Sequence, residues 1–180
     1  PKPQNNCYYI NKKCNLVIAH HPVIFSGLKK INKKNYVERT IIKAIKNNIA
    51  IYAIHTNLDN IQTGVNKTIC DKLRLKNTKI LYPKHLSLWV KMKVGSGMIG
   101  ELKKPMSEKD FLLFVKKQMQ TLCIRHTKLF DKKIRRVAVC GGAGSFLLSD
   151  AIWQKADIFI TADFKYHQFF DAEQQLIIAD

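Results

Sequence analysis

The chain has 180 residues, 46% of them hydrophobic, and a formal net charge of +18 at pH 7. This size allows one substantial core, so we expect a single domain over residues 1–180. No apolar run approaches the roughly 18 residues of a membrane span, and the first residues lack the apolar region of a secretory signal. Five scattered cysteines without a Cys-x-x-Cys pair favour reduced thiols. We therefore expect a soluble, cytoplasmic protein with no membrane partner.

The positive charge is a weak indication of nucleic-acid binding. Clustered Lys and Arg displace counterions from phosphates, but the lysines here are spread along the chain and accompany abundant Asn and Ile. A base-composition bias acting on solvated positions would give the same surface. We find no aromatic RNA-binding motif, zinc knuckle or helix-turn-helix pattern, so nucleic-acid binding stays an alternative.

The first half of the chain alternates short apolar runs with helical patterns. Residues 15–20 predict a buried strand, residues 36–48 an amphipathic helix and residues 49–54 a second strand. A further helix is predicted over residues 64–75, and residues 83–94 show no clear period. The expected buried face of the first helix consists of Val37, Ile41, Ala44 and Ile45.

The second half continues the alternation after a glycine-punctuated stretch at 95–102. Ser107 and Asp110 form a capping-box variant that opens a predicted helix reaching about Cys123. The remaining predicted elements are a strand over 135–140, a helix from about Ser145, and strands over 157–161 and 175–180. This order predicts the α/β class, an α/β/α sandwich whose mixed or parallel sheet is covered on both faces.

The dipeptide His20-His21 stands at the end of the first predicted strand. Neighbouring strand side chains point to opposite faces, so one pocket receives both imidazoles only if the chain turns there. Pro22 favours such a turn, because it has no amide hydrogen and restricts the residue before it. Open α/β sheets place ligands at this edge. The pair therefore predicts metal binding, with each histidine available to a different ion.

A second polar cluster, His55 and Asp59, follows the next predicted strand. Two-metal sites hold their ions about 3.5 to 4 Å apart, a distance that one carboxylate bridges. Asp59 is the candidate for this bridge. The alternative is that Asp59 caps the next segment, or forms an Asx turn with Asn57.

A third cluster, Thr161, Asp163, Tyr166 and His167, follows the strand predicted over 157–161. His167 is a candidate to ligate a metal, relay a proton or orient a substrate. It is equally consistent with a half-buried residue at the edge of the core.

Three glycines, Gly141, Gly142 and Gly144, join a predicted strand to a predicted helix. Such a segment can present backbone amides to an anion, but the spacing matches no P-loop or dinucleotide fingerprint. A tight turn is the alternative.

Five segments together resemble, in order, the Nif-three-like dinuclear metal-centre family, also known as GTP cyclohydrolase I type 2 homologues. The segments are VIAHHPVIFSGLK, YAIHTNLDN, GSGMIGEL, AVCGGAGSF and ITADFKYHQFFDA. The resemblance implies an α/β/α fold, a cytoplasmic toroidal homohexamer and two divalent metal ions facing an inner cavity. It assigns His20 and His21 as paired metal ligands and Asp59 as the bridging ligand. It places His55, Asp163 and His167 around the pocket.

The chain departs from the family pattern in three ways. The family takes a further His and Glu ligand from a block resembling Gly-His-Tyr-Glu-Ser-Glu, and this chain ends at Asp180. It also begins without Met and without the usual first strand and helix, so we expect a fragment incomplete at both ends. Longer relatives insert a domain near residues 77–94, where we expect a short linker.

The function implied by the resemblance is metal-assisted hydrolysis of a nucleotide or phosphoester, similar to GTP ring opening. Mixed imidazole and carboxylate ligation suits Zn, Fe, Mn, Co or Ni. The alternatives are a non-catalytic protein that binds a metal, a ligand or nucleic acid, and a relative that has lost its activity.

Overall fold

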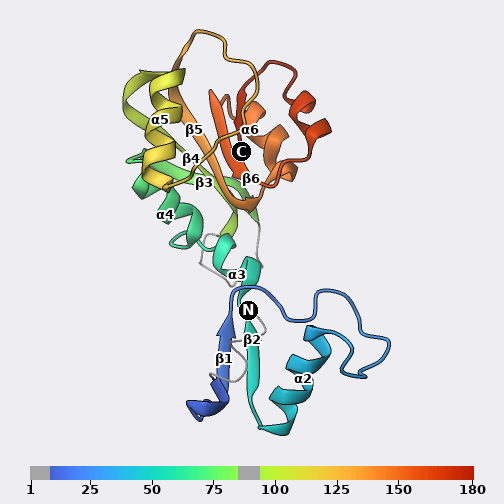
Figure 1. Cartoon of the computed structure of the whole chain (residues 1–180). Coiled ribbons are helices and arrows are strands. Elements are labelled where there is room, and N and C mark those ends of the chain that lie inside the picture. Colours follow the sequence, from blue (N-terminus) through green and yellow to red (C-terminus); the bar gives the residue numbers. More distant parts are fainter. Residues whose placement is uncertain (1–8, 85–93) are drawn as a thin grey trace. The chain divides into compact units, whose positions relative to one another are not determined.

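The computed structural model describes residues 9–84 and 94–180 (Figure 1). The chain divides into two compact units, with the boundary between Leu58 and Asp59, and each unit is described by itself. The single domain expected over residues 1–180 stays a prediction.

The first unit contains two parallel strands, β1 (Leu16–Ala19) and β2 (Ala50–Ala53), connected through helix α2 (Tyr36–Lys46). These elements confirm the three predicted at the start of the chain. Helix α2 begins after Asn35, whose side chain accepts a hydrogen bond from the Glu38 backbone N–H. Such a cap satisfies one of the amides left unpaired by the first helical turn.

The first unit is less buried than the sequence predicts. Leu16 and Ile18 are 50% and 66% exposed, so β1 is not a fully buried strand. Because side chains alternate along a strand, Val17 and Ala19 point to the opposite face, where they line a small cavity with Ala44 of α2. Ile45, expected on the buried face of the helix, is 67% exposed.

The second unit is built on a five-stranded mixed sheet of order β3-β4-β5-β6-β7. Its strands are β3 (Lys76–Lys84), β4 (Val94–Ser107), β5 (Lys133–Ala143), β6 (Ile158–Ala162) and β7 (Ile177–Ala179). The pairs β3/β4 and β4/β5 are antiparallel, whereas β5/β6 and β6/β7 are parallel. The last three strands confirm those predicted for the second half of the chain.

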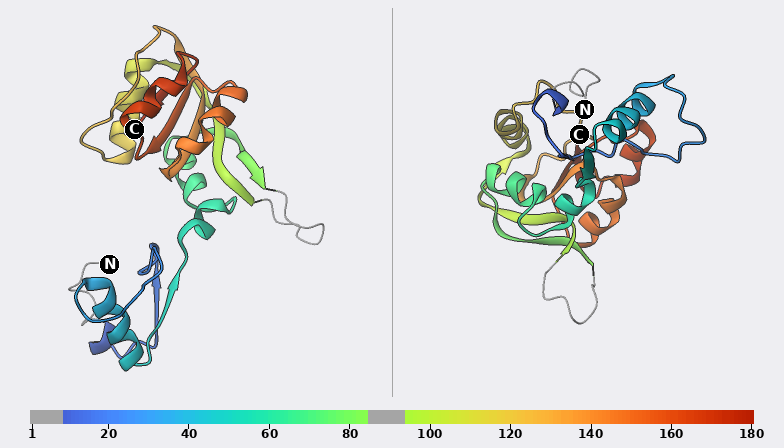
Figure 2. Two further views of the ribbon diagram at one scale, coloured as in Figure 1. Left: turned by 90° about the vertical axis from the view of Figure 1, so that its right-hand side faces the viewer. Right: turned by 90° about the horizontal axis from the view of Figure 1, so that it is seen from below.

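Strands β3 and β4 lie side by side, as Figure 2 shows. Strand β4 was not predicted from the sequence. Its glycines permit a close approach that a side chain would block. A Cβ atom added at Gly95 would lie 2.3 Å from the Tyr82 carbonyl oxygen, and one added at Gly100 would lie 3.0 Å from the Lys76 carbonyl oxygen. The residues that obscured the strand pattern therefore bring the two backbones together.

Helices cover both faces of this sheet. Helices α4 (Val65–Lys72) and α5 (Glu108–Met119) lie on one face, and α6 (Leu148–Trp153) lies on the other (Figure 1). Two short 3₁₀ helices, η1 (Ser145–Leu147) and η2 (Tyr166–Ala172), flank α6 and β7.

Alternating residues of β5 divide the core into two clusters. Val137 and Val139 pack with Phe111 of α5, whereas Ala138 and Cys140 belong to the cluster around α6. This period of two is what a strand buried on both faces requires. The predicted α/β/α sandwich with a mixed sheet is confirmed.

The boundaries of some predicted elements shift. Ser107 caps α5, and its Oγ accepts a hydrogen bond from the Asp110 N–H at 3.1 Å, as the sequence predicts. The helix ends at Met119 and not near Cys123, because Gln120 adopts a left-handed conformation with φ 53°. Such a residue ends a helix by changing the chain direction. Helix α3 (His55–Asn60) was not predicted.

The linker expected over residues 77–94 overlaps two strands. Residues up to Lys84 belong to β3, and β4 begins at Val94. Residues 85–93 lie outside the described residues.

The structure bears on the predictions about membrane spans and cysteine thiols. Within residues 9–84 and 94–180, no helix is long and apolar enough to cross a membrane. Cys14, Cys70, Cys123 and Cys140 carry free thiols, and Cys7 lies outside the described residues.

Removal of the Glu108 carboxylate should destabilise the second unit. Glu108 is 4% exposed, and its carboxylate accepts hydrogen bonds from the backbone N–H groups of Phe130, Asp131 and Lys132 at 3.0 to 3.2 Å. Glu108→Ala leaves these amides unpaired, so we expect a loss of about 2–3 kcal/mol in the free energy of unfolding. Urea unfolding measures it. The exposed neighbour Lys109→Ala is the control, and equal effects of both changes would contradict this role.

Candidate metal centre

The structure brings three imidazoles of the first unit together. His20 and His21 follow β1, and His55 follows β2 at the start of α3. Because β1 and β2 are parallel, their carboxyl ends meet at one edge. The ring centroids lie 4.7 Å apart for His20 and His21, 6.0 Å for His20 and His55, and 5.6 Å for His21 and His55. Two clusters separated by more than thirty positions in sequence thus form one group.

The local backbone explains this convergence. The chain bends at His20 and His21, which is the turn that two adjacent side chains need to share one pocket. The His55 N–H donates to the His20 carbonyl oxygen at 2.9 Å, beyond the last paired residues of the two strands. His55 has a positive φ of 32°, a conformation that costs free energy for a non-glycine residue.

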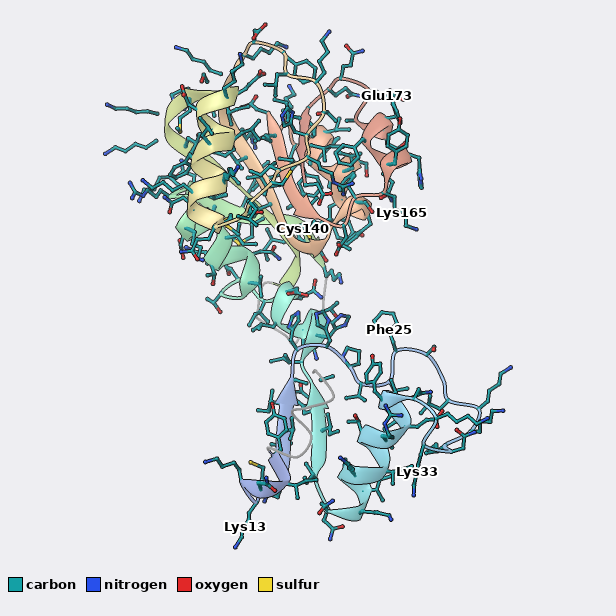
Figure 3. All side chains as sticks on the ribbon, in the orientation of Figure 1. Lys13, Phe25, Lys33, Cys140, Lys165 and Glu173 are labelled. Carbon is teal, nitrogen blue, oxygen red and sulfur yellow. The ribbon has the colours of Figure 1, made fainter. Side chains whose placement is uncertain are left out.

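One aromatic ring adjoins this histidine group. Phe25 makes an edge contact with His55 at a centroid distance of 6.3 Å, although its side chain is 83% exposed (Figure 3). An exposed phenyl ring beside imidazoles gives the group an apolar boundary. No signal in the sequence singled out Phe25.

The histidines supply nitrogen donors, but a complete ligand set is not evident. Imidazole nitrogen binds zinc at about 2.0–2.1 Å, and clustered rings are suitable donors for such an ion. In the part of the chain that the structure describes, no group of three or more His, Cys, Asp or Glu residues has the arrangement of a metal site. The assignments of His20, His21 and Asp59 as ligands therefore stay predictions.

Asp59 is the first residue of the second unit. It does not cap α4, because that helix begins after Gly64 without a side-chain cap. Among the described residues, its carboxylate makes no hydrogen bond or ion pair, which also excludes the Asx turn. Only its backbone carbonyl oxygen is held, by a hydrogen bond from Asn66 Nδ2 at 2.8 Å. The carboxylate therefore has no competing structural role in the described protein.

Asn66 connects Asp59 to the end of β5. Its side chain is 2% exposed, donates to the Asp59 carbonyl oxygen, and accepts a hydrogen bond from the Gly141 N–H at 2.8 Å. Sequence reasoning missed this residue, because one Asn in a helical stretch gives no signal of a long-range contact. Asn66 positions the backbone that carries Asp59.

The pKa of the Cys140 thiol depends on the charge of Asp59. Burial raises the pKa of the Cys140 thiol to about 11, and the negative charge of Asp59 raises it further in the same direction. Asp59 therefore lies close enough to the end of β5 for its field to reach this sulfur, which is labelled in Figure 3. Both causes favour the neutral thiol over the thiolate.

The glycine segment forms a tight connection from β5 to η1, with Gly141 and Gly142 in the last residues of the strand and Gly144 between the two elements. The Gly141 amide is occupied by Asn66, and the Gly142 carbonyl accepts a hydrogen bond from Thr161 Oγ1 at 2.8 Å. Gly142 has a positive φ of 74°, and a Cβ atom at Gly144 would lie 2.4 Å from Thr161 Oγ1. The turn alternative for these glycines is the one that the structure supports.

Asp163 and His167, the remaining pocket candidates, lie in the second unit. Both are exposed, and within residues 94–180 neither side chain makes a hydrogen bond or ion pair. Asp163 follows β6 with a positive φ of 60°, and His167 belongs to η2. Phe164 is buried at 2% exposure, but His167 is not, so the core-edge alternative for this histidine is wrong.

A family model gives the first comparison with known proteins. The model described as Duf34/NIF3 (NGG1p interacting factor 3) matches residues 5–179. The chain belongs to the Duf34/NIF3 family. This result confirms the resemblance drawn from the five sequence segments.

Individual relatives agree with the Duf34/NIF3 assignment. A Clostridium acetobutylicum protein named GTP cyclohydrolase 1 type 2 homolog is 33% identical over 168 residues, covering 93% of this chain and 62% of its own length. The crystal structure of a Bacillus cereus protein related to NIF3 has a TM-score of 0.86 at 25% identity, covering 99% of this chain and 75% of that one.

Relatives of this Duf34/NIF3 chain are longer than the chain. It spans 57–63% of the length of the first five curated relatives. The alignment with a Bacillus subtilis relative, 25% identical, extends over 264 residues while covering 91% of this chain and 71% of the relative. Since this chain has 180 residues, that relative contains residues inside the alignment that have no counterpart here.

Removing the Asn66 amide should destabilise the second unit and release Asp59. Asn66→Ala leaves the partly buried Gly141 N–H without its acceptor, which costs about 1–3 kcal/mol. Urea unfolding measures the loss. The control is Gln118→Ala on α5, because the Gln118 amide makes no hydrogen bond among the described residues. If both variants unfold at the same urea concentration, Asn66 does not hold this junction.

The charge of Asp59 should shift the titration of Cys140. At pH 8 roughly one thousandth of this thiol is ionised when its pKa is about 11. Asp59→Asn removes one cause of the upward shift, so the pH midpoint of Cys140 alkylation should fall while staying above the ordinary cysteine value. Mass spectrometry of the labelled peptides resolves each cysteine.

A matched control uses Asp71, which raises the pKa of Cys70. Asp71→Asn should lower the alkylation midpoint of Cys70 and leave that of Cys140 unchanged. If Asp59→Asn also leaves Cys140 unchanged, Asp59 does not lie near the end of β5.

Proposed function

We propose that this chain binds divalent metal ions through His20, His21 and Asp59, and that it is part of a dinuclear metal-dependent hydrolase. The observation that carries the proposal is the convergence of His20, His21 and His55 at the carboxyl ends of two parallel strands. Membership of the Duf34/NIF3 family and the names of its relatives support the same chemistry.

The donor set fits such an ion by its chemistry. Neutral imidazole and carboxylate are ligands for Zn, Fe, Mn, Co and Ni. Among the described residues, none of the His20, His21 or His55 rings makes a hydrogen bond or ion pair, and the Asp59 carboxylate makes none either. Donors without structural partners are available to a cation, and one carboxylate can serve two ions.

His55 and Asp59 share helix α3 at a spacing of four residues. His55 is suited to a role beside the proposed ligands, because its ring lies next to those of His20 and His21.

Metal chemistry would suit hydrolysis, since a divalent ion lowers the pKa of water and polarises a phosphoryl or carbonyl oxygen. The role of the chain is to hold its donors in place and to orient the substrate. Asp163 and His167 are exposed at the end of β6 and on η2, and they are our candidates for contacts to a nucleotide or phosphoester. We propose a cytoplasmic homohexamer as the working assembly.

Metal binding is the first test. Elemental analysis is carried out on the chain extended through the block that carries the family's further His and Glu ligands. After equilibration with Zn²⁺ and removal of excess metal, it should find up to two ions per chain. His20→Ala and Asp59→Ala should each lower this content. His126→Ala is a matched control, because His126 is exposed and, among the described residues, its side chain hydrogen-bonds only the neighbouring Thr127 carbonyl. A wild-type chain without metal, or equal loss in the control, would contradict the proposal.

Turnover separates the hydrolase from a binding protein. The metal-loaded chain is assayed with GTP, other nucleotides and phosphoesters. Metal-dependent hydrolysis that is lost in Asp59→Ala would support the enzyme. Bound metal with no turnover of any of these substrates would favour the non-catalytic alternative.

A further inference from the structure

We propose that a cleft on the second unit, the basic cleft, binds the phosphate backbone of a nucleic acid. It lies between the end of α4, the start of β3 and the middle of β4. The residues that line it are Asp71, Arg74, Leu75, Lys76, Lys103 and Lys104. Four of these carry positive charge, and none belongs to the proposed metal site.

The acidic groups beside the basic cleft are already paired with other cations. Asp71 forms an ion pair with Lys67, one helical turn away on α4. Glu101, which is opposite Lys76 in the β3/β4 register, pairs with Arg135 at 3.6 Å. Within residues 9–84 and 94–180, no ion pair involves Arg74, Lys76, Lys103 or Lys104. The cleft therefore keeps an uncompensated positive charge.

The backbone of β4 positions two of these lysines. Between Glu101 and Met106 on β4, the partners on β5 advance only from Arg136 to Ile134. Strand β4 therefore carries extra residues, and Lys103, Lys104 and Pro105 lie in this bulge. Proline has no N–H for the ladder and is tolerated at bulges. Bulges of this kind redirect side chains.

The bulge also lies outside the pairing between β3 and β4, because that register ends at Lys76 and Glu101. Lys103 and Lys104 are consequently exposed beside Arg74 and Lys76. Leu75 is 5% exposed and closes the cleft with an apolar residue. The result is an open cleft whose accessible polar groups are mostly ammonium and guanidinium.

This chemistry matches a chain of phosphates. Adjacent like charges repel, and a polyanion relieves that repulsion while releasing its own counterions. The cleft has no aromatic side chain on which a base stacks. Three of its four cations are lysines, which contact phosphate as point charges and do not read base edges. We therefore infer contact with the backbone, independent of sequence.

The test is binding of a fluorescent duplex DNA of about 20 base pairs and mixed sequence, followed by anisotropy between about 50 and 200 mM salt. The wild-type chain should bind, with an affinity that falls as salt rises. Lys103→Gln combined with Lys104→Gln should reduce the slope of log K against log salt by about 2, because two phosphate contacts are lost.

The matched control is Lys116→Gln combined with Lys117→Gln. This adjacent pair is exposed on α5, away from the basic cleft, and its replacement changes the net charge equally. The control should keep the wild-type slope. If the first pair proves unfolded by circular dichroism, Arg74→Gln combined with Lys76→Gln tests the same cleft. No wild-type binding at the lowest salt, or equal slope losses in the cleft and control variants, would overturn the proposal.

Discussion

The second unit depends on one buried amide. Asn66 lies on the first turn of α4. Its side chain hydrogen-bonds the backbone of Asp59 and the backbone of Gly141, which is near the end of β5. Both contacts involve groups that would lose water without compensation if the side chain were absent. The Asn66 Oδ1 accepts one of these hydrogen bonds and its Nδ2 donates the other. An Asp side chain could accept but not donate, and a Leu side chain could do neither. The position of the proposed bridging carboxylate thus depends on the packing of α4 against the sheet.

Most of the fold was predictable from the sequence because its signals are local. The apolar runs that became β5, β6 and β7 are short and continuous, as expected for strands covered on both faces. The caps at Asn35 and Ser107 also depend on near neighbours. What escaped prediction involves distant contacts. The glycines of β4 are explained only by their close approach to the backbone of β3. The end of α5 is a local exception, because the left-handed conformation of Gln120 gave no signal in the sequence.

The candidate site shows the same division. His20, His21 and His55 were identified because each follows an apolar run, and the parallel pairing of β1 with β2 brings their rings together. The contribution of Asn66 could not be predicted, since its partner Gly141 lies 75 positions away in the sequence. The choice between a ligand and a turn role for Asp59, and between a turn and an anion site for the glycines, depends on which hydrogen bonds these residues make. The periodicity of a sequence does not predict such hydrogen bonds. A sequence indicates which residues stand at strand ends, but only packing decides which polar groups remain unpaired.

The same reasoning applies to the net charge of +18. A base-composition bias adds lysines wherever the surface tolerates them, and it predicts no relation between their positions and the backbone. In the basic cleft, by contrast, the positions of the lysines follow the backbone. Two of its lysines lie in a bulge with Pro105, while Lys67 and Arg135 engage the neighbouring carboxylates. Because the chain has 31 basic and 13 acidic residues, random enrichment in lysine already leaves many cations without an acidic partner. The placement of Lys103 and Lys104 in a bulge of β4, outside the β3/β4 register, is therefore the structural property that composition alone does not explain.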